Sequence, residues 1–277
     1  MRRGLLQFSV GGFFAIGLSL LSQPAQANPV LPNLVNLNFV NYSGSAPKNT
    51  FTNVNPVGWT GGSGLIFIAT PGTSANSNSA CGTTYLQTYV CPSTLPIGAY
   101  NEVEADGNPE FESGFNYTIT GLTKGTTYDL SFYQAAGQQT TFQGATTEQW
   151  IVSLGTSGIT DNWVSSGMTC NPCTYSNPDI NASIVPTTIM NTPSKGGTDW
   201  NFVTVSLTAD ASTDILSFLA WGNNGSTTNL PPIVFLTGVN AAPPSVPEPG
   251  SIFLFGTVLL GVGGVIRHRR RVSTPTV

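Results

Sequence analysis

Residues 118–132 have the sequence TITGLTKGTTYDLSF, and this stretch decides the fold class. Tyr128, Leu130 and Phe132 occupy every second position, so an extended chain places them on one face. The Lys-Gly pair at positions 124–125 is a turn signal between two such segments. The pattern predicts a strand, a turn and a second strand that buries one face.

Short strand candidates of this kind recur through residues 28–242, separated by turns rich in Gly, Pro, Asn and Asp. No segment carries a long apolar stripe at helical spacing. Nine or more strands over about 210 residues predict an all-β domain, an antiparallel two-sheet β-sandwich of the jelly-roll type. Stretches 71–82 and 165–193 are expected to be surface loops. The strand candidates are residues 34–40, 65–69, 100–105, 117–121, 127–135, 149–154, 202–207, 215–221 and 233–239.

Charge is scarce and unevenly placed. Charged residues make up 8% of the chain, against roughly 25% in an average domain. Residues 28–246 contain three lysines, no arginine, no histidine and twelve acidic residues, a net charge of −9. Such a surface repels phosphate backbones, which excludes nucleic-acid binding. The one histidine, His268, lies in the tail, so the domain has no Ser-His-Asp or Cys-His nucleophile and no zinc site built on imidazole.

The N-terminus predicts a secretory signal peptide over residues 1–27. Two arginines precede an apolar run over residues 5–21, and a small-residue cleavage site with Ala25 and Ala27 follows. We expect export through the Sec translocon and a mature start at Asn28. The alternative is an uncleaved membrane anchor.

The C-terminus has three parts in order. A linker over residues 243–250 contains Pro247, Glu248 and Pro249; residues 251–266 form an uncharged apolar run; and a basic tail covers residues 267–277. Sixteen helical residues span about 24 Å, somewhat less than a hydrocarbon core of about 30 Å, and flanking arginines can make up the difference. This arrangement predicts a transmembrane helix with its basic tail in the cytoplasm and the domain outside.

Together these three parts resemble the PEP-CTERM sorting signal of Gram-negative bacteria. The resemblance implies that an exosortase recognises the tail of an inner-membrane precursor and processes it near the Pro-Glu-Pro motif. It also implies delivery to the cell surface or the extracellular matrix. The alternative is an ordinary single-pass anchor with a proline-rich linker.

The middle region carries a second resemblance. Residues 118–132, together with the stretch 212–238 that contains PPIVFLTGV, are similar to strands of galactose-binding-like and carbohydrate-binding-module-like jelly rolls. That resemblance implies a sandwich that binds sugar, with extracellular polysaccharide as the partner.

Five carboxylates lie close together in the sequence, at Glu102, Glu104, Asp106, Glu110 and Glu112. The first three share one face if the strand is regular, and that face would be crowded with negative charge. Three interpretations remain open: a solvated hairpin whose outward acids protect an edge strand, a structural Ca²⁺ site at Glu102, Glu104 and Asp106, or an acid and base pair for glycoside hydrolysis.

Four cysteines in an exported chain favour disulfides. Local pairing, Cys81 with Cys91 and Cys170 with Cys173, is the first expectation. Unpaired thiols, a metal site and a redox-active C-x-x-C are the alternatives, and the last lacks a thioredoxin-like context.

Large aromatic side chains are the remaining candidates for a ligand site, because a flat apolar ring matches the C–H face of a sugar. Trp59 and Trp163 stand beside polar turn residues and are the predicted platforms. Trp150 and Trp221 are expected in the core. Amide side chains such as Gln134 and those at positions 138, 139, 143 and 149 suit sugar hydroxyls and plain surface equally.

These observations predict an exported, non-catalytic surface or matrix protein that binds polysaccharide. A structural or adhesive protein without a small ligand is the second hypothesis, and self-association through an exposed apolar patch would favour it. A carboxylate-based glycosidase is the third, and it requires two acids roughly 5–9.5 Å apart in a cleft.

Overall fold

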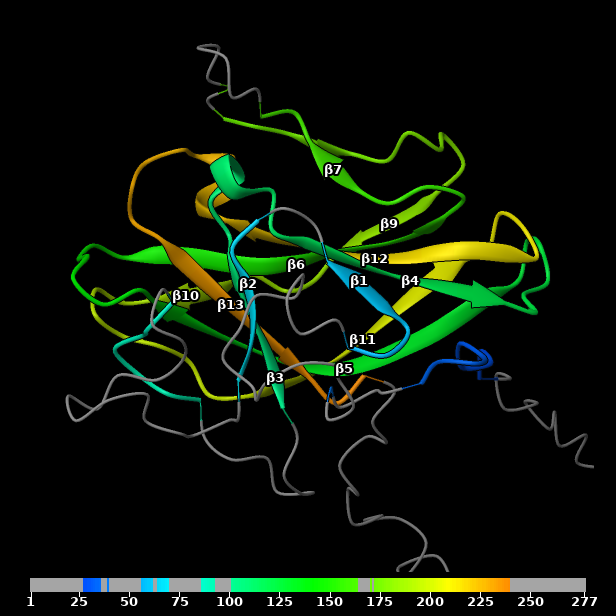
Figure 1. Ribbon diagram of the computed structural model, residues 1–277, viewed down its shortest axis with the longest axis horizontal. Helices are drawn as coiled ribbons and strands as arrows, with labels where there is room; N and C mark the ends of the chain where they lie inside the picture. Colours follow the sequence, from blue (N-terminus) through cyan, green and yellow to red (C-terminus); the bar gives the residue numbers. More distant parts are fainter. Residues whose placement is uncertain are drawn as a thin grey trace, which may run out of the picture.

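The computed structural model describes residues 27–35, 39, 56–61, 64–69, 86–92, 101–163, 170 and 172–239. Two antiparallel sheets lie face to face, with a small third sheet on the outside of one of them (Figure 1). The predicted all-β sandwich is therefore confirmed. The predicted signal peptide, the apolar run 251–266 and the loop 71–82 lie outside the described residues.

One sheet has six strands in the order β1-β4-β12-β6-β10, and β9 also pairs with β6. All of these pairs are antiparallel, and β12 has the longest ladders, to β4 on one side and β6 on the other. The strands are β1 (Trp59–Gly61), β4 (Gly114–Thr120), β6 (Thr146–Gly155), β9 (Ser183–Pro186), β10 (Met190–Thr192) and β12 (Thr213–Gly222).

The other sheet has five strands in the order β11-β5-β13-β3-β2, again all antiparallel. Two short 3-10 helices, η1 (Pro109–Phe111) and η2 (Asn223–Gly225), follow β3 and β12. The strands are β2 (Ile66–Ala69), β3 (Glu102–Asp106), β5 (Thr127–Gln138), β11 (Asn201–Thr208) and β13 (Pro232–Thr237).

The stretch 118–132 connects the two sheets. Its first half belongs to β4 in the six-stranded sheet and its second half to β5 in the five-stranded sheet. The Tyr128 hydroxyl accepts a hydrogen bond from the backbone N–H of Thr123 at 2.9 Å, which holds the turn against the strand that follows it. Both halves bury alternate apolar side chains between the sheets. The predicted alternation therefore holds, although the two strands belong to different sheets and do not form a hairpin.

The space between the sheets is filled by aromatic side chains. Phe218 at the middle of β12 lies 5.0 Å from Phe115, 6.0 Å from Trp150 and 6.2 Å from Trp59, measured between ring centroids. The Trp150 indole N–H donates to the carbonyl of Phe235 in the opposite sheet at 3.1 Å, so its one polar atom is satisfied. Trp150 is in the core, as its sequence context predicts.

A pair of glycines brings the two sheets together at one end. Gly107 donates to the carbonyl of Pro232 at 2.7 Å, and its own carbonyl accepts from the Gly222 N–H at 2.8 Å. A Cβ on Gly107 would lie 2.9 Å from that Gly222 nitrogen, so any side chain here would force the backbones apart.

Two buried amides on β5 hold neighbouring chain segments in place. Gln134 donates to the Thr188 carbonyl at 3.1 Å and accepts from the Thr187 hydroxyl at 2.7 Å. Gln138 donates to the Gly144 carbonyl and accepts from the Lys195 N–H at 2.7 Å. Both glutamines therefore hold chain connections in place, and their amides are already hydrogen-bonded.

Residues 155–163, 170 and 172–182 form a flap over the outer face of the six-stranded sheet, visible at the top of Figure 1 around β7. Its short sheet consists of β7 (Thr160–Asp161) and β8 (Tyr175–Ser176). The flap buries a second apolar cluster that includes Ile151, Leu219 and Trp221. Trp221 is thus buried, as expected, although under the flap and not between the sheets.

Two predictions about the backbone were wrong. Stretch 165–193 is not a simple loop, because it contains β8, β9 and β10, two of which extend the six-stranded sheet. Leu34 and Val35 do not lie in a strand, while residues 36–38 and 40 of that candidate lie outside the described part. Within the described ranges no helix is both long and apolar enough to span a bilayer.

Candidate functional site

Trp59 is not a ligand platform. Only 1% of its surface is exposed, because β1 places it beside Phe39, Phe115 and Tyr117 in the core. Its indole N–H donates to the Val35 carbonyl at 3.3 Å. Its neighbours in the sequence, a turn at residues 57–58 and the exposed Thr60, do not surround the Trp59 ring, which points the other way into the core.

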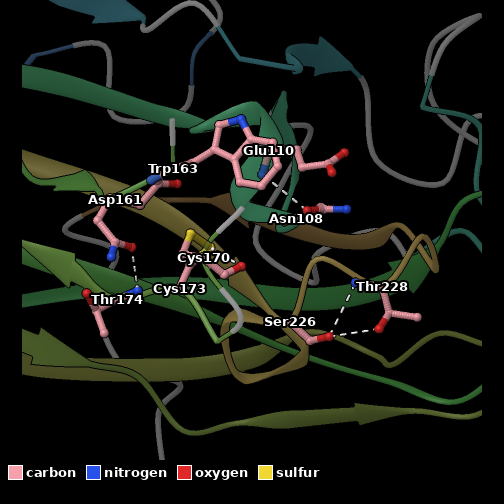
Figure 2. The surroundings of a disulfide bond; sticks show 10 residues. Asn108, Glu110, Asp161, Trp163, Cys170, Cys173, Thr174, Ser226 and Thr228 are labelled. Carbon is pink, nitrogen blue, oxygen red and sulfur yellow. Dashed lines mark hydrogen bonds between the residues drawn. A yellow bond between two sulfur atoms is a disulfide. The ribbon is translucent and has the colours of Figure 1, made fainter. Parts of the chain in front are cut away.

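Trp163 lies half-buried in the flap, just after β7. Its backbone N–H donates to Asp161 Oδ1 at 2.9 Å, and its ring packs with the cluster that contains Cys170 and Cys173 (Figure 2). Of the two predicted platforms, Trp163 is partly exposed to solvent, whereas Trp59 is buried.

The flap contains the Cys170–Cys173 disulfide, with its two Cα atoms 4.7 Å apart (Figure 2). The Cys173 N–H also donates to the Gly225 carbonyl at 2.7 Å, which ties the flap to η2. Cys91 is disulfide-bonded too, whereas its expected partner Cys81 lies outside the described residues. No described cysteine is a free thiol.

The acidic row on β3 is buried. Glu102, Glu104 and Asp106 are each at most 1% exposed, on the outer face of the five-stranded sheet, where Phe67 and Phe235 flank Glu104 on the neighbouring strands. The prediction of a solvated edge hairpin is therefore wrong, because β3 is an interior strand between β13 and β2 and its next strand, β4, joins the other sheet.

Burial changes the charge of this row. It raises the pKa of Asp106 to about 7, and burial followed by repulsion from Glu104 raises the pKa of Glu102 well above its usual range. Asp106 Oδ2 and Glu102 Oε2 are buried without a hydrogen-bond partner. Among the described residues, no group of three or more His, Cys, Asp or Glu side chains is placed to hold a metal ion. Calcium at Glu102, Glu104 and Asp106 stays a prediction.

The five clustered carboxylates do not meet in one cleft. Glu110 is exposed on η1, and Glu112 follows η1 directly as its C-cap, so neither belongs to the buried row on β3. Burial and repulsion from Glu112 raise the pKa of Asp161 to about 6, although the Trp163 N–H opposes this rise.

The structure has an open groove, here called the edge groove, where the two sheets end side by side. Its walls come from β10 at the edge of the six-stranded sheet and from β11 at the edge of the five-stranded sheet. Its volume is about 450 Å³. It is lined by Gln134, Thr188, Ile189, Met190, Asn191, Thr198, Asn201, Phe202 and Val203.

None of the residues that line the edge groove is charged. Asn191 and Asn201 are exposed, and Ile189 is 51% exposed, so amides stand next to an apolar surface. The Phe202 ring is half-buried and held by an edge-on contact with Tyr133 at 5.1 Å. Sequence reasoning missed this groove, because β10 and β11, although consecutive in the chain, join different sheets, and Gln134 of β5 reaches the groove from more than fifty residues earlier.

A second hollow, here called the flap pocket, lies between the flap and β4 and has a volume of about 310 Å³. Asn116 of β4 and Ser157 and Gly158 of the flap contribute to it. The pocket is lined by Glu112, Gly114, Asn116, Ser157, Gly158, Ile159, Thr160 and Pro178.

Residues 245–271 match the PEP-CTERM protein-sorting motif. This match confirms the resemblance carried by Pro247, Glu248 and Pro249 and by the apolar and basic segments after them. The motif marks an exported, membrane-anchored precursor that is sorted to the cell surface. No curated protein matches the chain.

Several solved structures are similar over most of the described domain. The CBM22-2 xylan-binding domain of Paenibacillus barcinonensis Xyn10C is 14% identical with a TM-score of 0.31, over 70% of this chain and 97% of that domain. The Clostridium thermocellum xylanase 10B CBM22-1–GH10 modules, complexed with xylohexaose, are 11% identical with a TM-score of 0.30, over 71% of this chain and 27% of that one. The enzymatically active domain of bacteriophage CBA120 tailspike protein 4 is 12% identical with a TM-score of 0.29, over 72% of this chain and 21% of that one.

This chain therefore spans about a fifth of the phage protein and about a quarter of the xylanase modules. Xylan and xylohexaose belong to those proteins, and a ligand for this chain has to be argued from its own residues. The chain carries a PEP-CTERM sorting motif at residues 245–271.

Proposed function

We propose that this exported protein binds extracellular polysaccharide in the edge groove without cleaving it, and that the bound stretch of sugar is uncharged. The observation that carries the proposal is the lining of the groove: amides and hydroxyls next to apolar side chains, with no charged group among them.

The exposed polar groups of the groove suit sugar hydroxyls. An amide both donates and accepts hydrogen bonds, as a sugar hydroxyl does, and Asn191 and Asn201 present such amides from the two opposite walls. Ile189, with 51% of its surface exposed, supplies an apolar surface of the kind that the C–H face of a sugar ring requires. A volume of about 450 Å³ falls in the usual range for ligand sites, roughly 300–1,000 Å³.

The same lining supports a binding role over a catalytic one. Glycoside hydrolysis normally needs two carboxyl groups that flank the scissile bond. The edge groove has no Asp or Glu among its lining residues. A sugar chain held there would meet hydrogen-bonding groups and no acid or base.

Replacing Asn191 and Asn201 together by alanine is expected to weaken polysaccharide binding by about tenfold or more, because each lost hydrogen bond contributes roughly 0.5–1.5 kcal/mol. Both side chains are exposed, so the fold should be unaffected. The measurement is retardation of the full chain, purified in detergent, in gels that contain neutral or anionic bacterial exopolysaccharides. The matched control is the double variant Thr204→Ala, Asn181→Ala, two exposed polar positions outside the groove.

Equal retardation of the asparagine variant and the wild type would contradict the assignment of the groove. Retention only on anionic polymers would contradict the uncharged ligand. If no polymer retards the wild type, a structural or adhesive surface protein becomes the better hypothesis.

The sorting motif supports a route to the surface. We expect an exosortase to process the inner-membrane precursor near Pro247, Glu248 and Pro249 and to release the domain to the cell surface or the extracellular matrix. The mass of the mature C-terminus, compared between a wild-type host and a host without exosortase, tests this. An identical full-length C-terminus in both hosts would show that the tail is an ordinary anchor.

A further inference from the structure

β11 forms one edge of the five-stranded sheet and lacks the features that usually protect such an edge. All 8 of its residues pair with β5 in an unbroken register, and no other described strand pairs with it. Its sequence, NFVTVSLT, contains no charged residue and no proline. Edge strands of soluble proteins are normally short, charged, bulged or interrupted by proline, because an unprotected edge can pair with another strand.

The other described edge strands are short. β1 and β10 have 3 residues each, β2 has 4, and β9 has 4 and ends at Pro186. β11 is therefore the one long open edge among the strands that the structure describes.

The backbone groups of alternate β11 residues point away from β5. Asp129 of β5, which lies opposite Ser206, uses both its N–H and its C=O in hydrogen bonds to the segment 29–31. Its backbone groups therefore face away from β11, so Asp129 and Ser206 form a non-hydrogen-bonded pair of the ladder. The N–H and C=O groups of Ser206, and of Thr204 and Thr208 two residues to either side, consequently point to the open edge.

Nothing in the described part of the chain covers this edge. The side chains of Thr204, Ser206 and Thr208 are all exposed. Ser206 Oγ donates to Asp129 Oδ1 at 2.7 Å, and the Thr208 hydroxyl shares a hydrogen bond with that of Thr127 at 3.0 Å. These side chains are thus held over β5, and they leave the outward backbone groups accessible.

A second copy of the same strand, running antiparallel, matches this edge. With a two-fold axis at Ser206, each Ser206 faces its counterpart and each Thr204 faces a Thr208. The outer face then pairs hydroxyl side chains, which can hydrogen-bond across strands. The inner face pairs Val205 with Leu207, both of which belong to the core cluster, so the apolar row continues from one copy into the next.

Charge also favours another copy over a differently built partner. Residues 28–246 have a net charge of −9, so a partner recognised by charge would be basic and would need acids on the edge. β11 has none, and it offers only backbone groups and small uncharged or apolar side chains. A second β11 edge matches both and brings no like charges face to face within the paired strands.

We propose that two copies of this protein pair through the open edges of their β11 strands, with a two-fold axis at Ser206, so that their five-stranded sheets form one continuous sheet. The contact is isologous and closes on itself, which gives a dimer. The pairing uses residues 204–208 and leaves residues 201–203, which line the edge groove, outside it. It is independent of polysaccharide binding.

Cysteine cross-linking tests the register. Hydrogen-bonded residues opposite each other in an antiparallel pair have Cα atoms about 5.5 Å apart, a distance that a disulfide spans. The Ser206→Cys full chain, oxidised in detergent, is therefore expected to form a covalent dimer. Thr204→Cys is the matched control, because its two copies would lie about 14 Å apart and should not cross-link. Thr204→Cys combined with Thr208→Cys should restore the covalent dimer.

Sedimentation of the full chain in density-matched detergent measures the pairing without added cysteines. The wild type is expected to be dimeric at micromolar concentration. Ser206→Lys should raise the dissociation constant about tenfold or more, because it places two ammonium groups face to face. Thr118→Lys makes the same charge change at an exposed position of β4 and should leave the dimer intact.

The apolar segment 251–266 is the same in every variant, so a loss of dimer confined to Ser206→Lys assigns the contact to β11. A wild type that stays monomeric at high micromolar concentration would overturn the proposal. So would equal dissociation of the two lysine variants, or equal cross-linking of Ser206→Cys and Thr204→Cys.

Discussion

Phe218→Ala is expected to lower the free energy of unfolding by about 3–5 kcal/mol, a large part of the stability of an ordinary domain. Phe218 is fully buried at the middle of β12, between its strand partners Phe115 and Val152. Its ring stacks on Phe115 at 5.0 Å and meets Phe132 of the opposite sheet edge-on at 5.4 Å. Truncation would therefore leave a cavity between the sheets that the surrounding large rings cannot fill.

Urea unfolding followed by tryptophan fluorescence measures this effect. Ile180→Ala is the control, because Ile180 is 95% exposed on the flap and its truncation should change the free energy of unfolding by less than about 0.5 kcal/mol. A cost below about 1 kcal/mol for Phe218→Ala would mean that the aromatic cluster is not the centre of the core.

Stability is expected to fall as the pH rises from about 4 to about 7. Burial raises the pKa of Asp106 to about 7 from its ordinary value of 3.8, and the pKa of Glu148 to about 7 from 4.5. Hydrogen bonds from the Asn108 N–H to Asp106 and from the Thr192 hydroxyl to Glu148 only partly oppose these rises. Across this window the folded state keeps protons that the unfolded state has released, so the free energy of unfolding decreases with pH.

Each of these two carboxyls contributes a loss on the order of 3 kcal/mol between pH 4 and pH 8. The contribution of Glu102 has the same sign, because burial and then repulsion from Glu104 raise its pKa as well. Asp179 acts oppositely: hydrogen bonds from the Thr156 and Asn181 backbone lower its pKa, so its contribution is lost only under more acidic conditions.

Thermal unfolding at pH 5 and pH 8 measures this dependence directly. Asp106→Asn and Glu148→Gln should each raise stability at pH 8 and flatten the profile, because an amide has no proton to lose. Asp199→Asn, which replaces an exposed acid, should leave the slope unchanged. Equal stability of the wild type at pH 5 and pH 8 would contradict the raised pKa values of Asp106 and Glu148.

The local alternation of side chains was enough to predict the β-sandwich. Tyr128, Leu130 and Phe132 all face the core, as their spacing of two predicts, and all are at most 7% exposed. Side chains of a strand alternate between its two faces with a period of two residues. This alternation depends only on neighbouring residues, so it can be predicted without knowing the rest of the fold. The sorting motif at residues 245–271 was predictable for a similar reason, since its parts are contiguous.

Burial was less predictable, because it depends on what covers a face. The alternation of Glu102, Glu104 and Asp106 with apolar residues correctly predicts a shared face, yet that face is buried and also carries a second apolar cluster that includes Phe67 and Phe235. Trp59 fails in the same way, since β1 carries it into the core although its neighbours in the sequence are polar.

The fold class, the faces of the long strands and the sorting signal could all be predicted from local patterns, because each depends on residues that are close together in the chain. The positions of the two hollows depend on the tertiary structure. The edge groove brings together β10, β11 and Gln134 of β5, and the flap pocket brings Glu112 and Asn116 beside residues 157–160. Both depend on which sheet each strand joins and on how the two sheets pack against each other, and these are set by the whole core.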